Sequence, residues 1–340
     1  MQRRIFVHLW GLLLLLAGIT TAQATNTCVF NTAGGVMTLA GDCSTDSTIL
    51  IPNGYTLDGR NHTITAADPS GGHFLGAVVQ NSGALANVTN LRITTAGLAN
   101  VCDFGSAGLR GILFDGASGT IQRNTISHLN QGASACQEGN GIEVHNFSTT
   151  GSIPPVQTVI ITGNKVFAYQ LSGIACDGYV SCLVRSNVVG ASATQADQPT
   201  NSIQIRYGAR AMVEKNDVSG NSWAGNTNNV STAILLYYAA DGTVVRRNKL
   251  MGGNADIGIY AYTDGATVAN NQVYKTGRDP NQAGWDVGIY VHSPTNKAEV
   301  TATNTVVNNK VRGFLFAFNS PELATRGGGK NIASLSPVGN

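Results

Sequence analysis

The sequence repeats two short signatures in alternation, and this repeat limits the possible folds more than any other feature. The first signature is Gly-Ile followed by residues of alternating polarity. Its clear copies begin at Gly111, Gly141, Gly173, Gly258 and Gly288. The second is an Asn between Val, Ile or Leu residues, at Asn124, Asn164, Asn187, Asn216, Asn248, Asn271 and Asn308. One cycle takes roughly 25 to 32 residues, and fixed periods of this size indicate a solenoid.

Each cycle contains three short segments of period 2, separated by Gly, Asn or Asp, which predicts strands. A short strand with one apolar row can bury that row only by stacking on the next cycle. Asn between two strands suits a sharp bend, because Asn tolerates left-handed φ and bonds its own backbone. Stacked asparagines can also form a ladder of side-chain hydrogen bonds.

This repeat resembles that of right-handed parallel β-helix proteins, the architecture of many pectate lyases, polygalacturonases, alginate-active enzymes and phage tailspikes. The resemblance covers roughly residues 49–318, and residues 57–64 are similar to a first-coil signature of such proteins. It implies an all-β, single-domain solenoid with three short strands per coil and end caps. We expect a signal peptide at 1–24, an N-terminal cap at 25–48, the β-helix at 49–319 and a C-terminal cap or tail at 320–340.

The N-terminus is typical of a secretory signal. Arg3 and Arg4 precede an apolar segment at residues 12–17, and residues 22–24 form a small-x-small cleavage site. The apolar segment is too short to span a membrane. We therefore expect a secreted protein, extracellular or periplasmic, with no membrane partner.

Charged residues make up 12% of the chain, about half the usual share. This excludes a coiled coil, a charged disordered chain and an electrostatic nucleic-acid binder. Without Arg3 and Arg4 the chain has 19 Lys and Arg against 19 Asp and Glu. Six basic residues flank the repeat asparagines, and we interpret them as a solvated face: Arg123, Lys165, Arg185, Lys215, Arg246 and Arg247.

Six cysteines on a secretory route predict three disulfides. Fifteen pairings are formally open. The local pairing joins Cys28 to Cys43, Cys102 to Cys136, and Cys176 to Cys182. A metal site would need Cys-x-x-Cys pairs, which the sequence lacks.

Aligning the Gly-Ile strands predicts two outward columns of side chains. Ile142 and Val144 point inward, so Glu143 and His145 point outward. The first column is Leu113, Glu143, Ala175, Gln204, Leu235, Tyr260, Tyr290 and Leu315. The second is Asp115, His145, Asp177, Arg206, Tyr237, Tyr262, His292 and Ala317. A surface column with a purely structural role would instead hold Thr, Ser, Asn and Val.

Extra residues precede several Gly-Ile strands, at 98–106, 128–140, 190–199, 220–229 and 277–285. Loops clustered on one edge of a solenoid usually build its binding face. These loops carry Trp223 and Trp285, two coils or roughly 10 Å apart, about the length of a disaccharide. Aromatic rings suit the apolar face of a sugar. The alternative is that both tryptophans only pack their own loops.

The second column could support either of two reactions. Glycoside hydrolysis needs two carboxyl groups that flank the bond, and Asp115 with Asp177, or Glu143 with Asp177, could provide them. In β-elimination a base removes a proton beside a uronate carboxylate. His145 or Tyr237 could be that base, with Arg206 neutralising the substrate carboxylate.

Motifs of specific enzyme families are missing. The chain lacks the Asn-Thr-Asp, Asp-Asp, Gly-His-Gly and Arg-Ile-Lys motifs of polygalacturonases, the Asp-Pro-His of alginate epimerases, Gly-x-Ser-x-Gly and His-Glu-x-x-His. No cofactor is required on this evidence, and calcium stays open.

We therefore predict a secreted carbohydrate-active protein that cleaves or modifies a polysaccharide as a lyase or a glycoside hydrolase. The alternative is an adhesive solenoid that binds a cell-surface glycan without turnover. The predicted catalytic residues are Asp177, His145, Glu143 and Asp115. The predicted substrate-binding residues are Arg206, Gln204, Tyr237, Tyr260, Tyr262, Tyr290, His292, Trp223 and Trp285.

Overall fold

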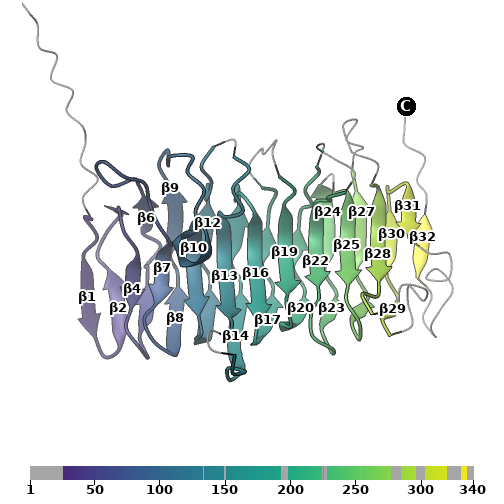
Figure 1. The fold of residues 1–340 in the computed structure, drawn as a ribbon, viewed down its shortest axis with the longest axis horizontal. Helices are drawn as coiled ribbons and strands as arrows, with labels where there is room; N and C mark the ends of the chain where they lie inside the picture. Colours follow the sequence, from purple (N-terminus) through teal and green to yellow (C-terminus); the bar gives the residue numbers. More distant parts are fainter. Residues whose placement is uncertain are drawn as a thin grey trace, which may run out of the picture.

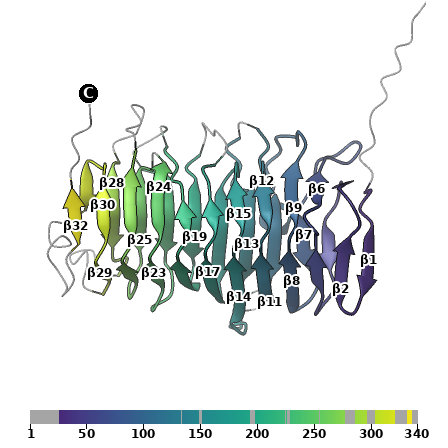
Figure 2. The ribbon, with the colours of Figure 1, turned by 180° about the vertical axis from the view of Figure 1, so that it is seen from behind.

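The computed structural model describes residues 26–132, 134–148, 151–192, 198–223, 225, 228–253, 255–276, 285–295, 303–319 and 331–334. The predicted signal peptide lies outside these residues, as does most of the predicted C-terminal cap. The strands stack in chain order from one end of the molecule to the other (Figures 1 and 2).

The strands form three sheets, called A, B and C here. Sheet A contains β1 (Phe30–Ala33), β2 (Val36–Leu39), β5 (Thr56–Asp58), β8 (Leu85–Thr89), β11 (Ser118–Gln122), β14 (Gln157–Thr162), β17 (Val180–Arg185), β20 (Arg210–Glu214), β23 (Val244–Arg246), β26 (Thr267–Ala269) and β29 (Thr305–Val307). Sheet B contains β3 (Cys43–Thr45), β6 (Thr63–Ala66), β9 (Arg92–Thr95), β12 (Thr125–Ser127), β15 (Lys165–Phe167), β18 (Val188–Val189), β21 (Asp217–Val218), β24 (Lys249–Gly253), β27 (Gln272–Lys275), β30 (Lys310–Arg312) and β32 (Ile332–Ser334). Sheet C contains β4 (Ile49–Ile51), β7 (Ala77–Asn81), β10 (Arg110–Asp115), β13 (Asn140–Asn146), β16 (Ser172–Gly178), β19 (Asn201–Arg206), β22 (Thr232–Tyr237), β25 (Ile257–Tyr262), β28 (Val287–His292) and β31 (Phe316–Phe318).

Each coil runs through one strand of sheet A, one of sheet B and one of sheet C. Neighbouring coils pair in parallel, and β1 pairs with β2 in antiparallel fashion at the N-terminal end. A single 3-10 turn, η1 (Gly105–Ala107), is the one helical element among the described residues. The predicted parallel β-helix with three strands per coil is confirmed.

The core is a set of apolar rows, one coil above the next. The isoleucines of the Gly-Ile strands, such as Ile112, Ile142 and Ile174, are fully buried. The glycine before each one has no room for a side chain. A Cβ on Gly141 would lie 2.4 Å from Val166 Cγ1 and 2.7 Å from the Gly173 carbonyl oxygen. The Gly of the repeat is therefore a packing requirement of the coil.

The predicted asparagine ladder is present at the corner between sheets A and B, which we call the A–B corner. Each amide donates to the side-chain oxygen of the next Asn, as Asn187 does to Asn216 over 3.0 Å. In the last coils the ladder passes through Asn309 and Asn331, and not through Asn308 as the sequence alignment predicted.

The left-handed bend at this corner also differs from the expectation. Positive φ falls on the residue before the ladder Asn, for example Arg123 (54°), Lys215 (56°) and Arg247 (55°). The asparagine itself turns inward, because its amide satisfies the buried polar groups of the corner.

The three disulfides follow the predicted local pairing. Cys28 joins Cys43, Cys102 joins Cys136, and Cys176 joins Cys182. The first lies at the N-terminal end, the second joins two loops between sheets B and C, and the third lies inside the coil between β16 and β17. Such disulfides are consistent with secretion.

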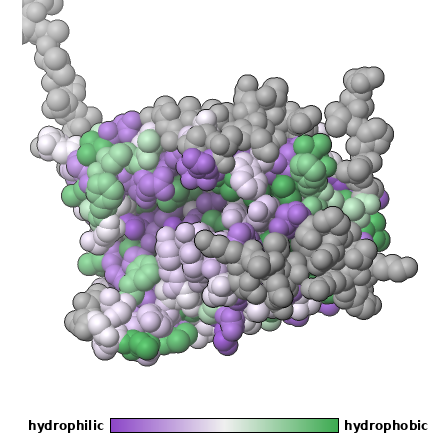
Figure 3. Space-filling view, turned by 45° about the vertical axis from the view of Figure 1, so that its right-hand side comes forward, coloured by the Kyte–Doolittle hydropathy of each residue, from purple (hydrophilic) through white to green (hydrophobic). Residues whose placement is uncertain are grey.

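The surface of the solenoid is uneven. The side seen in Figure 3 is hollowed near its middle, where hydrophilic side chains gather, and hydrophobic patches lie nearer its ends. Within the described part of the chain no helix has the length and apolar character needed to cross a membrane.

Candidate functional site

The predicted second column runs across sheet C near the C-terminal ends of its strands. The strand register pairs Asp115 with His145, His145 with Asp177, and Asp177 with Arg206. It continues from Arg206 through Tyr237 and Tyr262 to His292. Seven coils therefore place acidic, basic and aromatic side chains in one line, as the alignment predicted.

The first column is also in register, from Leu113 and Glu143 to Tyr260 and Tyr290. The last coil is a correction to both columns. The predicted columns would pair Ile289 with Phe314, but Ile289 pairs with Phe318, four residues later. Leu315 and Ala317 are thus out of line with Tyr290 and His292, because the chain after Gly313 makes a longer turn before β31.

The charged part of the second column is an ion-pair cluster centred on His145. Its Nδ1 lies 2.7 Å from Glu143 Oε1, and its Nε2 lies 3.2 Å from Asp115 Oδ1. Arg110 Nε donates to Glu143 Oε2 over 2.8 Å, and Asn140 donates to the same oxygen over 2.5 Å. We call Arg110, Asp115, Asn140, Glu143 and His145 the histidine cluster.

Burial and charge act against each other in this cluster. Burial alone would lower the pKa of His145, but hydrogen bonds to Asp115 and Glu143 raise it to about 9. Burial would raise the pKa of Glu143, yet His145 and Arg110 bring it well below its usual range. The hydrogen bond to His145 also lowers the pKa of Asp115. His145 is thus an imidazolium at neutral pH, held between two carboxylates.

The members of the cluster differ in access to solvent. Half of the Asp115 side chain is exposed, whereas Glu143 as a whole is only 4% exposed. A ligand on this face can therefore reach Asp115 and the edge of the His145 ring. Glu143 fits a positioning role behind His145 better than the direct acid or base role that the sequence suggested.

The surroundings of Asp177 differ from those that its predicted catalytic role requires. It is 1% exposed, and both its oxygens accept from Arg206, over 2.7 and 2.6 Å. Its complete burial raises its pKa, and the guanidinium of Arg206 opposes that change. A carboxyl group enclosed in this way is poorly placed to exchange a proton with a ligand.

The guanidinium group of Arg206 is also held by contacts within the protein. Besides Asp177, its Nη1 and Nε lie 2.9 Å from the side-chain oxygen of Gln204, when that amide is oriented to satisfy both Arg206 and Ser172. Its guanidinium also packs over the ring of Tyr207. Gln204 is buried as well. The predicted carboxylate clamp at Arg206 and the predicted ligand contact at Gln204 are therefore internal contacts of the sheet.

The C-terminal half of the face carries aromatic rings in mutual contact. Tyr237 stacks on Tyr262 with centroids 5.4 Å apart, and Tyr262 contacts His292 at 5.2 Å. In the first column Tyr260 contacts Tyr290 at 5.1 Å, and Tyr290 contacts Trp285 at 5.5 Å. We call these six residues, with Tyr207 and Tyr238, the aromatic stripe.

Two phenols of this stripe have raised pKa values. Burial raises the pKa of Tyr260 to about 12 and also raises the pKa of Tyr237. Tyr237 therefore suits hydrogen bonding to a ligand and does not suit the role of base that the sequence suggested.

The two predicted tryptophans have different surroundings. Trp285 is half-buried and contacts Tyr290, so it lies on the stripe. Trp223 is only 7% exposed, and its backbone NH donates to the carboxylate of Asp256. The ring of Trp223 packs against Gly225 of its own loop, so its burial does not suit the ligand-binding role that the sequence predicted.

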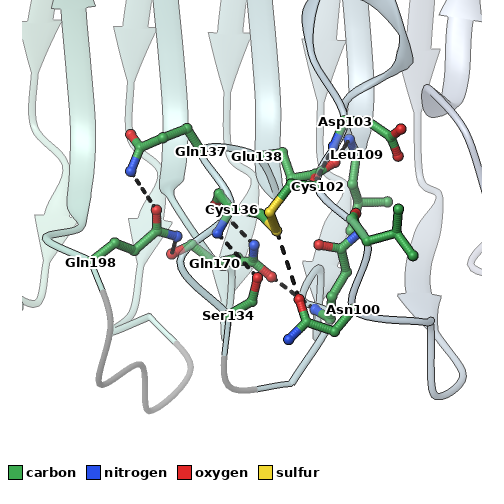
Figure 4. The surroundings of a disulfide bond; sticks show 12 residues. Asn100, Cys102, Asp103, Leu109, Ser134, Cys136, Gln137, Glu138, Gln170 and Gln198 are labelled. Carbon is green, nitrogen blue, oxygen red and sulfur yellow. Dashed lines mark hydrogen bonds between the residues drawn. A yellow bond between two sulfur atoms is a disulfide. The ribbon is translucent and has the colours of Figure 1, made fainter.

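The described parts of the long loops lie between sheets B and C, and each loop leads into the first residue of a strand of sheet C. They therefore border the first column, and the second column lies at the other end of the strands. Figure 4 shows how two of these loops are joined by Cys102 and Cys136. There the buried carboxylate of Glu138 accepts from the backbone NH groups of Asp103 and Leu109.

Four residues of the site were missed by the sequence reasoning. Arg110 and Asn140 stand directly before the Gly of the Gly-Ile signature, so they could have been found as a third outward column. Tyr207 and Tyr238 follow the strands of the second column, at positive φ. They are 52% and 45% exposed, and the Tyr-Tyr and Arg-Tyr pairs of the sequence were the available signal.

The sequence left calcium binding open, and that question stays untested. Among the described residues, no group of three or more His, Cys, Asp or Glu side chains is placed to hold a metal ion.

A family model described as "Right handed beta helix region" matches residues 110–327. The chain belongs to this right-handed β-helix family. The match spans the histidine cluster and the aromatic stripe, and it gives the handedness of the solenoid.

Similar solved structures include the Dettilon tailspike protein (17% identity, 81% of this chain, TM-score 0.44). This chain spans about half the length of that protein, 54%. A mutant form of the periplasmic alginate epimerase AlgG is 11% identical over 83% of this chain and 73% of that one, with a TM-score of 0.42. The receptor-binding protein of bacteriophage Det7 is 10% identical over 86% and 74%, with a TM-score of 0.22. No curated protein matches the sequence.

Proposed function

We propose that the protein is a secreted β-helix protein that binds a polysaccharide along sheet C and acts on it through His145 and Asp115. The observation that carries this proposal is the register of one column, which joins an ion-pair cluster to a row of aromatic rings. Aromatic faces suit the apolar faces of sugars, and phenol hydroxyls can hydrogen-bond to the hydroxyl groups of a sugar.

The cluster defines the chemistry that we propose. His145 carries a proton at neutral pH, so it can donate one to a leaving oxygen. Asp115 is ionised and exposed, so it can accept a proton from water or from the sugar. Glu143 and Arg110 hold His145 in place from the buried side. The cluster thus offers one general acid and one general base beside a row of aromatic rings.

The same contacts weigh against β-elimination of a uronate. Elimination needs a cation that neutralises the carboxylate of a uronate while the adjacent proton leaves. On the described part of this face, both arginines are paired, Arg110 with Glu143 and Arg206 with Asp177. A neutral or sparsely charged polysaccharide therefore fits the face best.

The internal pairing of these charges favours a second function. The charges of the histidine cluster and of the Asp177–Arg206 pair are satisfied within the protein, as in a surface that binds glycan without turnover. Under this alternative the aromatic stripe binds a cell-surface glycan, and the ion pairs only shape the face.

A panel of neutral and uronic polysaccharides tests both functions. New reducing ends without ultraviolet absorbance from unsaturated uronates indicate hydrolysis, and both signals together indicate a lyase. The variants Asp115→Asn and His145→Gln should abolish turnover and preserve binding. Binding without either signal in the native protein would favour the adhesive function, and neither binding nor turnover across the panel would contradict the proposal.

A further inference from the structure

The basic residues of the molecule are concentrated along the A–B corner. Eleven of the 19 Lys and Arg residues that follow position 24 lie there. They are Arg60, Arg92, Arg123, Lys165, Arg185, Lys215, Arg246, Arg247, Lys249, Lys310 and Arg312. We call this set the basic ridge. Arg246 is half-buried and the other ten are exposed.

The ridge is not balanced by acids. Four acidic residues lie at the same corner, namely Asp42, Asp58, Glu214 and Asp217. Glu214 is buried and pairs with Arg246 at 2.8 Å, and it lies 3.9 Å from Arg185. The corner thus carries a net charge of about +7, while the remainder of the chain beyond position 24 carries about −7. Positive charge is thus concentrated at this corner, although the chain beyond position 24 has no net charge.

The spacing of the ridge follows the coil. Eight of the nine consecutive coils from β6 to β30 contribute these residues, and the coil of β26 and β27 contributes none. Adjacent coils are about 4.8 Å apart, so the ridge is a straight line of roughly 40 Å with about one cation per coil. All of these cations except Arg60 lie within two residues of a ladder asparagine or begin or end a short strand of sheet B, so the backbone fixes their period.

This charge density selects one kind of polymer. Duplex DNA carries one charge per about 1.7 Å of axis, far denser than the ridge. Single-stranded nucleic acids are bound by cations combined with rows of aromatic side chains, and the ridge has no such row: Tyr274, under Arg312, and Phe167 are its isolated aromatic neighbours. Two coils match the length of a disaccharide at roughly 10 Å, so one coil matches one sugar.

We propose that the basic ridge is a binding surface for a linear anionic polysaccharide with about one carboxylate or sulfate per sugar. It lies on a different corner from the aromatic stripe and is independent of catalysis there. Its role is to hold the protein on a charged glycan while sheet C stays free.

The test uses polygalacturonate, which has one carboxylate per sugar, and its methyl ester, which has the same backbone without charge. The ridge variant is Arg123→Asn, Lys215→Asn and Arg247→Asn combined. Asn already occupies the equivalent left-handed corner positions at Asn90, Asn270 and Asn308, so the fold tolerates it. Arg210→Gln, an exposed cation off the ridge, is the matched control.

We expect the native protein to bind polygalacturonate more tightly than the ester, with an affinity that falls as salt is raised. The ridge variant should bind about tenfold more weakly or worse, with an unchanged melting temperature, and Arg210→Gln should bind normally. Ser186→Lys, which adds a cation in line with the ridge, should tighten binding.

Equal binding by the ridge variant and the native protein would overturn the proposal, as would tighter binding of a duplex or single-stranded nucleic acid than of polygalacturonate. The double variant Tyr237→Ala, Tyr262→Ala should keep this binding, which separates the ridge from the proposed function of sheet C.

Discussion

The guanidinium group of Arg206 donates hydrogen bonds to both carboxylate oxygens of Asp177, one coil away, at 2.7 and 2.6 Å. Both side chains are buried or nearly so, and they belong to the column in which an exposed acid and an exposed cation were expected. A buried pair of this geometry is costly to break from one side, because the remaining charge loses its partner.

Arg206→Ala should therefore lower the free energy of unfolding by about 3 to 5 kcal/mol. The double variant Asp177→Leu, Arg206→Leu should cost less than the sum of Asp177→Leu and Arg206→Leu measured singly, because it leaves no buried charge unpaired. Urea unfolding of the two single variants and the double variant measures this difference. A cost for Arg206→Ala below about 1 kcal/mol would mean that the pair is solvated.

The stability of the protein should depend on pH through His145. Its pKa is raised in the fold from 6.5 to about 9, so its ion pairs contribute fully below pH 6.5 and are lost as pH rises through 9. The contribution is at most roughly 3 kcal/mol, because a shift of one unit corresponds to about 1.4 kcal/mol. At the acid end, the lowered pKa values of Glu143 and Asp115 make stability fall as pH drops below their ordinary values.

Melting temperature against pH tests this account, and His145→Gln should remove the decline between pH 6.5 and 9. A native profile that is flat across that interval, or that rises through it, would show that His145 is not held as an imidazolium.

The asparagine ladder should be a main source of coil stability. Asn216 donates to Asn248 and to the Val184 carbonyl, and its oxygen accepts from the side chain and backbone of Asn187. Asn216→Ala should cost about 2 to 4 kcal/mol, because several buried polar groups lose their partners. Lys215→Asn, one residue earlier and exposed, is the control and should change stability little. Comparable losses in both variants would show that the ladder is not the cause.

The disulfides should differ in their effect on stability. Cys102–Cys136 closes a loop with a sequence separation of 34, and Cys176–Cys182 one with a separation of 6. Chain-entropy arguments give roughly 4 kcal/mol for the first and roughly 2 kcal/mol for the second. Thermal unfolding of the two Cys→Ala double variants measures the order, and a larger loss for the shorter loop would contradict the entropic explanation.

The sequence was sufficient for the sheets and their register because both depend on period. Gly141-Ile142 and its copies set the alternation of inward and outward side chains, and a parallel stack can then align His145 only with Asp115 and Asp177. The alignment failed after Gly313, where the turn before β31 is longer and no Ile follows the Gly.

The roles of the column residues were harder to predict, because period does not give burial. Asp177 and Asp115 occupy equivalent positions, yet the arginine on the next coil buries one and solvent reaches the other. Trp223 and Trp285 both lie in loops of the same class, and only the packing of each loop decides which ring reaches the stripe. The sequence predicts a solvated face for six residues of the ridge, and period alone does not show that eleven cations share one corner.

Affinity for a bound polysaccharide in a variant of the aromatic stripe tests the central claim most directly. For a glycan that the native protein binds, the double variant Tyr237→Ala, Tyr262→Ala should lose about 2 to 4 kcal/mol of binding free energy, because two stacking faces disappear. Tyr274→Ala, an aromatic residue on sheet B, should bind as the native protein does. Unchanged affinity in the stripe variant, or an equal loss in Tyr274→Ala, would contradict a polysaccharide site on sheet C.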